Sequence, residues 1–245
     1  MKFRFFLILL LGSMICSCDS GDIYPPEPSF ESTYTLNISY TLSGIETIPN
    51  VDLEENKLKL MFILYCKDGS TQTKIIDNGV DNKEEIVSME YVPYEVEKLD
   101  LSIVGTSKSD VIYTFKSITL PNAQEGDVEK SVEFNKKSTP IELVSFDRLR
   151  AQLFDISCIS CHGSTGRYPY LDGNSSYSNI VKKSSPHPII GMNIITPGDL
   201  ATSSMYYILT GDKANLTYSH SSSGLTKVND ITLIKSWIEN GAPKN

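Results

Sequence analysis

The sequence predicts two domains: an N-terminal all-β antiparallel sandwich, immunoglobulin-like or related, over 31–144, and a C-terminal all-α domain over 145–245. Three observations predict this division. Apolar and polar residues alternate with period two across 31–144. From Ser145 onward, apolar residues recur at helical spacing instead. Charge is also divided unevenly, because residues 18–144 carry 23 Asp and Glu against 11 Lys and Arg, whereas 145–245 carry 7 against 9.

The chain begins with a basic start and a short apolar run, residues 5–11, that cannot span a bilayer as a mature helix. We therefore expect residues 1–17 to be a signal peptide. The segment Ile15-Cys16-Ser17-Cys18 resembles a bacterial lipobox, and Cys18 is the expected lipidation site. Ordinary signal cleavage that leaves a free Cys18 is the alternative. Residues 18–30, stiffened by three prolines, are expected to be a lipid-anchored linker on a bacterial membrane, facing the periplasm or at the cell surface.

The period-two runs of the next domain predict about seven short strands. The clearest run is 34–42, which stops at Ser43-Gly44. The other strand candidates are 57–65, 74–76, 86–92, 99–105, 111–120 and 128–134. About seven strands separated by turn residues are typical of a β-sandwich. No His precedes residue 162 and no catalytic constellation is evident, so we expect this domain to be a spacer or a docking surface.

The C-terminal domain is expected to consist of short helices and long loops. An amphipathic helix should begin at Ser145 and run into the first cysteine of a C-x-x-C pair. Short helices are expected at 177–181 and 205–209, and a last helix should begin at Thr226 or Asn229. About one hundred residues of this kind are enough to enclose one prosthetic group.

The string Cys158-Ile159-Ser160-Cys161-His162 has the C-x-x-C-H spacing of a c-type haem attachment site. Cys158 and Cys161 can each add to a vinyl group of one porphyrin, and His162 would then be the proximal iron ligand. The alternatives for the cysteine pair are a disulfide, a redox dithiol or half a zinc site. Zinc needs a second ligand pair, which the sequence lacks, and a thioredoxin-like dithiol needs a βαβ context. We therefore expect one covalent haem c as the cofactor.

Residues 145–245 resemble a family of bacterial c-type cytochrome domains that occur fused to other modules in exported proteins. The matching segments are the attachment motif at 158–163, Leu171-Asp172, Thr196-Pro197-Gly198-Asp199, Ser203-Ser204-Met205-Tyr206, and the tail from Leu225 through Trp237 to Pro243. The resemblance implies a cytochrome c-like fold, covalent haem c and electron transfer. It says nothing about residues 31–144.

In the family that the domain resembles, a Met shortly before the tail is the distal iron ligand. Residues 216–224 contain no Met, and His220 is the nearest residue able to bind iron. We expect His220 to be the distal ligand, because neutral imidazole is a good ligand for iron. Met192 and an open distal position beside Tyr218 are the alternatives.

The formal net charge is −8 at pH 7 and becomes −10 once residues 1–17 are removed, which argues against nucleic acid as a partner. We expect a lipid-anchored, extracytoplasmic monohaem cytochrome that carries single electrons between redox proteins, rather than an enzyme that converts a substrate. The alternative is a surface binding or scaffold lipoprotein whose sandwich recognises a partner. A third hypothesis is an enzyme or sensor that uses an open iron site.

Overall fold

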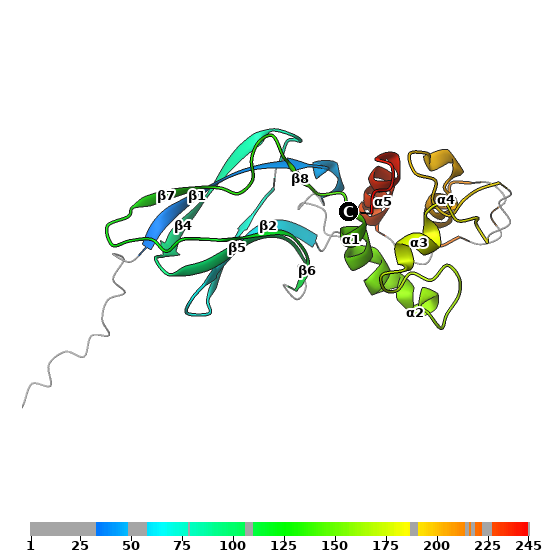
Figure 1. Ribbon diagram of the computed structural model, residues 1–245, viewed down its shortest axis with the longest axis horizontal. Helices are drawn as coiled ribbons and strands as arrows, with labels where there is room; N and C mark the ends of the chain where they lie inside the picture. The colour runs from blue at the N-terminus through cyan, green and yellow to red at the C-terminus, as the bar shows by residue number, and fades with distance from the viewer. Residues whose placement is uncertain are drawn as a thin grey trace, which may run out of the picture. The chain divides into compact units, whose positions relative to one another are not determined.

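The computed structural model describes residues 33–48, 58–77, 79–105, 110–186, 191–213, 216, 219–221 and 227–244 (Figure 1). Thr33–Asn245 form one compact unit. Of the residues that the structure describes, 36% lie in strands and 25% in helices, so β-sheet outweighs helix. Within the described ranges, no helix combines the length and the apolar composition that a membrane crossing requires.

The first sheet is built around β1, which pairs on both of its sides. Its strands are β1 (Thr33–Ser43), β4 (Glu84–Pro93), β7 (Glu129–Glu133) and β8 (Ile141–Glu142). β4 runs antiparallel to β1, whereas β7 and β8 run parallel to it and cover successive halves of its other edge. The Asn135 side chain bridges the gap between these halves by bonding both the N–H and the C=O of Thr41.

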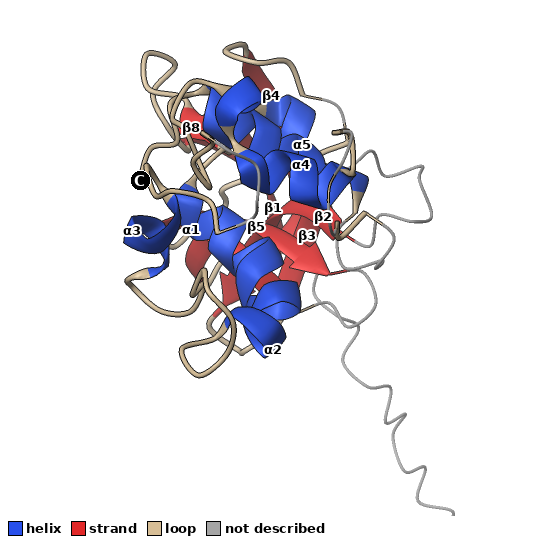
Figure 2. Ribbon diagram, turned by 90° about the vertical axis from the view of Figure 1, so that its right-hand side faces the viewer, coloured by secondary structure: helices blue, strands red, loops and turns tan. Residues whose placement is uncertain are grey.

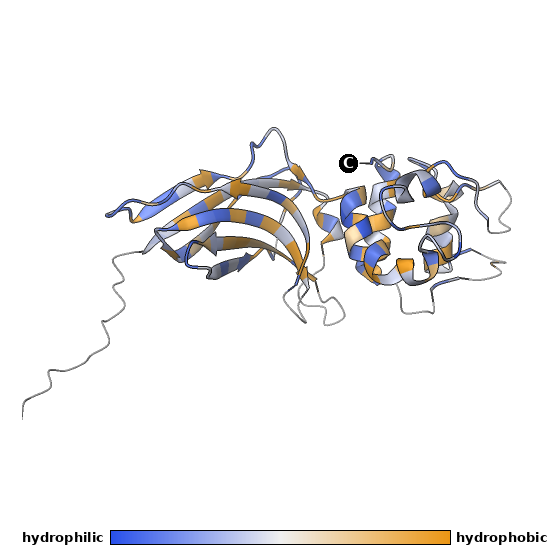
Figure 3. Cartoon of the chain, turned by 60° about the horizontal axis from the view of Figure 1, so that its bottom comes forward, coloured by the Kyte–Doolittle hydropathy of each residue, from blue (hydrophilic) through white to orange (hydrophobic). Residues whose placement is uncertain are grey.

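The second sheet is antiparallel throughout and has the strand order β3-β2-β5-β6. These strands are β2 (Leu58–Cys66), β3 (Thr71–Ile75), β5 (Val96–Gly105) and β6 (Val111–Thr119). Hydropathy alternates along the strands of both sheets (Figure 3). Alternation of this kind places one set of side chains in the core and the other on the outer face.

The inward side chains of the two sheets form a single apolar core. Phe62 of β2 is fully buried, with its ring 5.3 Å from that of Tyr40 in β1 and 5.0 Å from that of Phe134, both in edge-to-face orientation. Cys66 is a buried free thiol in the same core. The two sheets are therefore packed face to face as a sandwich.

The second half of the chain contains short helices joined by turns (Figure 2). The helices are α1 (Phe146–Leu149), the π-helix η3 (Arg150–Cys158), α2 (Ile159–His162), α3 (Ser176–Ile180), the 3-10 helix η4 (Leu200–Thr202), α4 (Ser204–Thr210) and α5 (Val228–Glu239). Trp237 of α5 is fully buried in their core, where its ring lies 5.5 Å from Phe146 and 6.3 Å from Tyr177.

The expected fold class is wrong in two respects. The sandwich is mixed rather than antiparallel, because residue alternation specifies which face a side chain occupies and not the direction of the neighbouring strand. The all-α cytochrome c-like domain expected over 145–245 is also wrong, because the described residues form only short helices in a mostly β molecule. Isolated bridges such as Val181↔Ile195 replace helix in part of this region.

A buried arginine joins the sandwich to the helices. Arg148 of α1 donates to Thr47 O at 2.8 Å, to Thr47 Oγ1 at 2.7 Å and to Leu143 O at 2.7 Å. Its Nε donates to Gln152, whose amide in turn donates to Asp230 of α5. Burial lowers the pKa of Arg148 to about 9, and the charge of Asp230 partly opposes this shift. Thr47 lies in the 3-10 helix η2 (Ile45–Thr47), directly after β1.

Candidate functional site

The helix that leads to the C-x-x-C-H string has an unusual hydrogen-bond pattern. Ser145 caps its start by accepting a hydrogen bond from Arg148 N–H at 3.2 Å. The chain then forms the π-helix η3, in which Ile159 N–H donates to Phe154 O, five residues earlier. Such i→i+5 turns are rare and frequently accompany functional sites. Sequence spacing alone predicts an ordinary α-helix here.

A tight loop after α2 orients the His162 ring. His162 Nδ1 lies 3.0 Å from Arg167 O and 3.1 Å from Pro169 O. Because carbonyl oxygens only accept hydrogen bonds, these contacts assign the proton to Nδ1 and leave a lone pair on Nε2. A backbone contact of this kind is the usual way to orient a ligating imidazole.

The loop can close only because residue 166 is glycine. Arg167 N–H donates to Cys161 O at 2.8 Å, and Leu171 N–H donates to His162 O at 2.7 Å. A Cβ atom on Gly166 would lie 2.3 Å from Cys161 O. The glycine therefore allows the close backbone approach that places the two carbonyls beside the imidazole.

The structure brings His220 to the other side of the same site. The ring centroids of His162 and His220 are 6.2 Å apart, with the ring planes tilted by 42°. His220 is half-buried, and its backbone N–H donates to Ile208 O of α4 at 2.6 Å. Sequence reasoning cannot trace the path of the 57 residues between the two histidines, yet the fold brings the two rings close together.

A cavity of about 80 Å³ lies at this pair of rings. Its apolar lining includes Leu153, Phe154, Leu171, Ile194, Met205, Ile208 and Leu209, and its polar lining includes His162, His220, Cys158 and Ser204. No Asp, Glu, Lys or Arg side chain of the described residues lines it. A small apolar chamber with a few convergent polar groups is the usual form of a ligand site.

The two cysteines of the string differ in exposure. Cys158 is partly buried and lines the cavity, whereas Cys161 is exposed and is not part of the lining. Burial raises the pKa of Cys158 to about 12, with the charge of Asp230 as a smaller cause. Thiol–disulfide exchange requires a thiolate, and this environment disfavours the thiolate form of Cys158.

The other sequence candidates have different outcomes. Met192 is half-buried, contacts Lys213 through its sulfur at 3.6 Å and does not line the cavity. Tyr218 and the expected lipidation site Cys18 lie outside the described residues.

The buried Ser204 lines the cavity but was not expected as a site residue. The only sequence signal for Ser204 is its place in the segment 203–206, which resembles the corresponding segment of c-type cytochrome domains.

The expectation of one covalently bound haem c is corrected by the structure. Among the described residues, no group of three or more His, Cys, Asp or Glu side chains gathers that could hold a metal ion. The physical reason lies in the string itself. A macrocycle tethered through Cys158 and Cys161 needs both thiols to face one slot, and only the first of them lines the cavity.

Comparisons of the chain with protein-family models, with curated proteins and with solved structures found no match. The resemblance of residues 145–245 to c-type cytochrome domains therefore stays a prediction from the sequence.

Proposed function

We propose that the protein is a lipid-anchored, extracytoplasmic carrier of single electrons that exchanges them with other redox proteins. Its redox group would be held at the cavity between His162 and His220. The supporting sequence features are the export signal, the lipobox-like segment at Cys18 and the family resemblance of 145–245. Covalent haem c is not part of the proposal.

The observation that carries the proposal is the pair of neighbouring imidazoles in the lining of one mostly apolar cavity. Their centroid separation of 6.2 Å allows a bound group to contact both rings at once. The two carbonyls behind His162 hold its ring and direct Nε2 away from the loop. The lining is mostly apolar and offers few polar partners, so the potential of a bound redox group would depend strongly on these few contacts.

A potentiometric titration of the mature protein, purified from a bacterial host that exports and lipidates it, tests the proposal. We expect a reversible one-electron transition in the wild type, loss of the redox group in His162→Ala, and a shifted midpoint potential in His220→Ala. His187→Ala is the matched control, since His187 is the one histidine of the sequence besides His162 and His220. A wild-type protein without any redox transition contradicts the proposal, and intact-mass measurement would identify the group if one is present.

The membrane anchor has its own test. Cys18→Ser should move the protein from the membrane fraction to the soluble fraction and abolish metabolic labelling with a radioactive fatty acid. Cys16→Ser should leave both unchanged. Equal fractionation of the two variants would contradict lipidation at Cys18.

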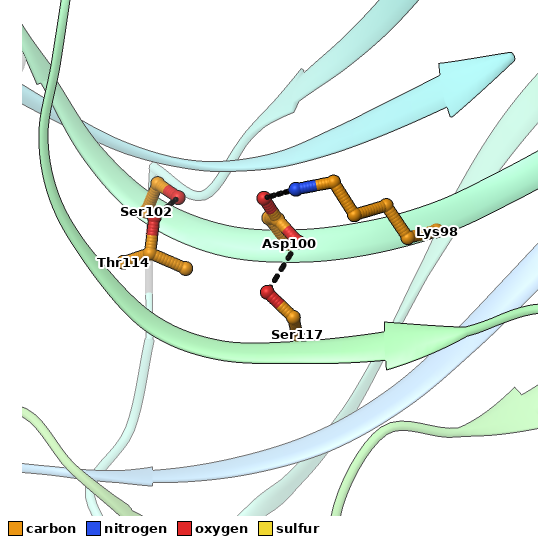
Figure 4. A network of polar contacts seen from close by, with 5 residues as sticks. All are labelled: Lys98, Asp100, Ser102, Thr114 and Ser117. Atoms are coloured by element: carbon orange, nitrogen blue, oxygen red, sulfur yellow. Dashed lines mark hydrogen bonds and ion pairs between the residues drawn. The ribbon is translucent and has the colours of Figure 1, made fainter.

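A second candidate function, partner recognition by the sandwich, is favoured by the outer face of the second sheet. Asp100 and Ser102 point away from the core but are buried, and Asp100 bonds Lys98 Nζ at 2.7 Å and Ser117 Oγ at 2.6 Å (Figure 4). Ser102 Oγ lies 2.9 Å from Thr114 Oγ1. An ordered polar network of this kind is unusual on the outer face of a sheet, where polar side chains are mostly solvated.

The same outer face contains a groove of about 370 Å³, lined in part by Met61, Tyr65 and Thr73. A photo-crosslinking residue at Thr73 should give one specific adduct in intact cells if the groove receives a partner. The same residue at Ser131, which is exposed on the first sheet, should give none. Identical adduct patterns at the two positions would contradict recognition through the groove.

A further inference from the structure

Ser203 and Ser204 are neighbours at the start of α4 but differ in how their hydroxyl groups are used. Ser203 Oγ accepts from Thr196 N–H at 2.9 Å and donates to Asp199 O at 2.8 Å. Ser204 is 1% exposed and its Oγ has no hydrogen-bond partner among the described residues. Buried hydroxyl groups in folded proteins nearly always have a partner, so each exception needs an explanation.

The position of Ser204 supplies that explanation. Ser204 lines the cavity that also receives the two imidazoles. Its backbone is held by two strong contacts, since its N–H donates to Asn193 O at 2.9 Å and the next N–H, of Met205, donates to Ile194 O at 3.1 Å. The serine is thus held in place at the wall of the cavity, while its hydroxyl group is left unused.

We propose that Ser204 Oγ donates a hydrogen bond to the group bound between His162 and His220, an inference that rests on the proposed function. The bound group then presents one hydrogen-bond acceptor toward α4. That acceptor is a neutral atom, such as a carbonyl oxygen or a ring nitrogen, because the described lining has no Lys or Arg to balance an anionic one. The remainder of the group is apolar, since aliphatic and aromatic side chains make up most of the lining.

The contact has a consequence for the reduction potential. An acceptor atom gains electron density when its group is reduced, so a donated hydrogen bond stabilises the reduced form more than the oxidised form. Ser204→Ala should therefore lower the midpoint potential. Ser204→Thr keeps the hydroxyl group, so its midpoint potential should lie close to that of the wild type.

The chain offers a matched control. Ser176 is also fully buried, is the first residue of a short helix in the same core, and donates to Gly173 O at 2.8 Å. Ser176→Ala should lower the unfolding temperature but leave the midpoint potential unchanged, because Ser176 does not line the cavity.

The test is a potentiometric titration of the four full-length mature proteins, with far-UV circular dichroism to verify folding. A lower potential in Ser204→Ala, with recovery in Ser204→Thr and no change in Ser176→Ala, supports the inference. An unchanged potential in a folded Ser204→Ala protein overturns the inference and leaves the proposed function standing. A wild type without a redox transition overturns the proposed function itself, and with it the group that Ser204 would contact.

If Ser204→Ala does not fold, Ser204→Cys takes its place. Cysteine is a weaker donor of similar size, so its midpoint potential should be lowered by a smaller amount.

Discussion

The sandwich and the helical half satisfy their buried backbone groups in different ways. In the sandwich, strand ladders pair most N–H and C=O groups, and side chains only have to fill the core. Apart from α5 and the continuous run of α1, η3 and α2, the helices of the second half are so short that their unpaired ends make up much of each one. Individual side chains serve these ends, as Ser145 does for α1 and Asp199 does for η4. The helical half therefore depends on single polar contacts, whereas the sandwich depends on many equivalent ones.

Replacement of Arg148 with Met should have the largest effect, because this residue serves both regions. Thr47 O and Leu143 O would each lose a buried donor, at about 1–3 kcal/mol per carbonyl, so a loss of roughly 2–6 kcal/mol is expected. Urea denaturation measures it. The fluorescence of Trp237, the only tryptophan, reports the helical half, and far-UV circular dichroism reports the secondary structure of both regions.

The same experiment tests the link between the two regions. Wild-type transitions by the two probes should coincide, and those of Arg148→Met should separate, with the helical half unfolding first. Arg150→Met is the control, since Arg150 is partly exposed and its Nε lies 3.5 Å from Asp155. That variant should lose less than about 1 kcal/mol. Coincident transitions in the Arg148 variant would show that other contacts join the two regions.

Gly166→Ala should have an intermediate effect that is confined to the helical half. The added methyl group would collide with Cys161 O, so the loop must move at a cost of about 1–3 kcal/mol, and the two carbonyls beside His162 Nδ1 would move with it. The ¹⁵N chemical shifts of the His162 ring measure the change. Thr165→Ala, at an exposed residue of the same loop, is the control for substitution nearby. Unchanged ring shifts in Gly166→Ala would disprove the role of the loop.

Ser145→Ala should cost about 1 kcal/mol, the usual value of a helix cap. The loss should appear in the tryptophan transition and be no larger in the circular dichroism transition. Ser138→Ala is the control, since Ser138 is exposed and lies in a nearby turn. A loss as small as that of the control would mean that the cap contributes little to α1.

The smallest expected effect lies in the sandwich and depends on pH. Burial, and then the charge of Glu85, raises the pKa of Tyr40. The Tyr40 phenol loses its proton near pH 10 in the unfolded chain but keeps it in the folded protein. The contribution of Tyr40 to stability is therefore fully present below about pH 10 and falls as the pH rises further. The decline is measured through unfolding temperatures between about pH 8 and about pH 11, a range that includes the ordinary pKa of a tyrosine phenol. Tyr40→Phe should flatten it and the exposed Tyr91→Phe should not. Equal slopes in both variants would contradict this assignment.

Sequence periodicity located the strands well where the apolar pattern is strict. The runs predicted at 34–42 and 57–65 correspond to Thr33–Ser43 and Leu58–Cys66. The run predicted at 74–76 was misplaced, because Thr71–Ile75 is a largely exposed edge strand with little apolar alternation. The two-residue strand β8 is too short to have a pattern at all.

Within the candidate site, the sequence singled out His162 by the C-x-x-C-H spacing and His220 through the resemblance to c-type cytochrome domains. It could not show that their rings lie close together, that Cys161 is exposed, or that Ser204 lines the same cavity. These facts depend on the path of the chain between distant residues. Local preferences do not encode that path.

The sequence by itself determined which residues alternate, where the helical spacing begins, and which side chains could bind a redox group. These properties are local, because they follow from side-chain chemistry and from the periods of strand and helix. Only the tertiary structure decided the parallel pairing of β7 and β8 with β1, the link through Arg148 and the chamber between the two imidazoles. Each of these joins residues far apart in the chain, and the free energy that selects among such contacts comes from packing and hydrogen bonding of the whole core.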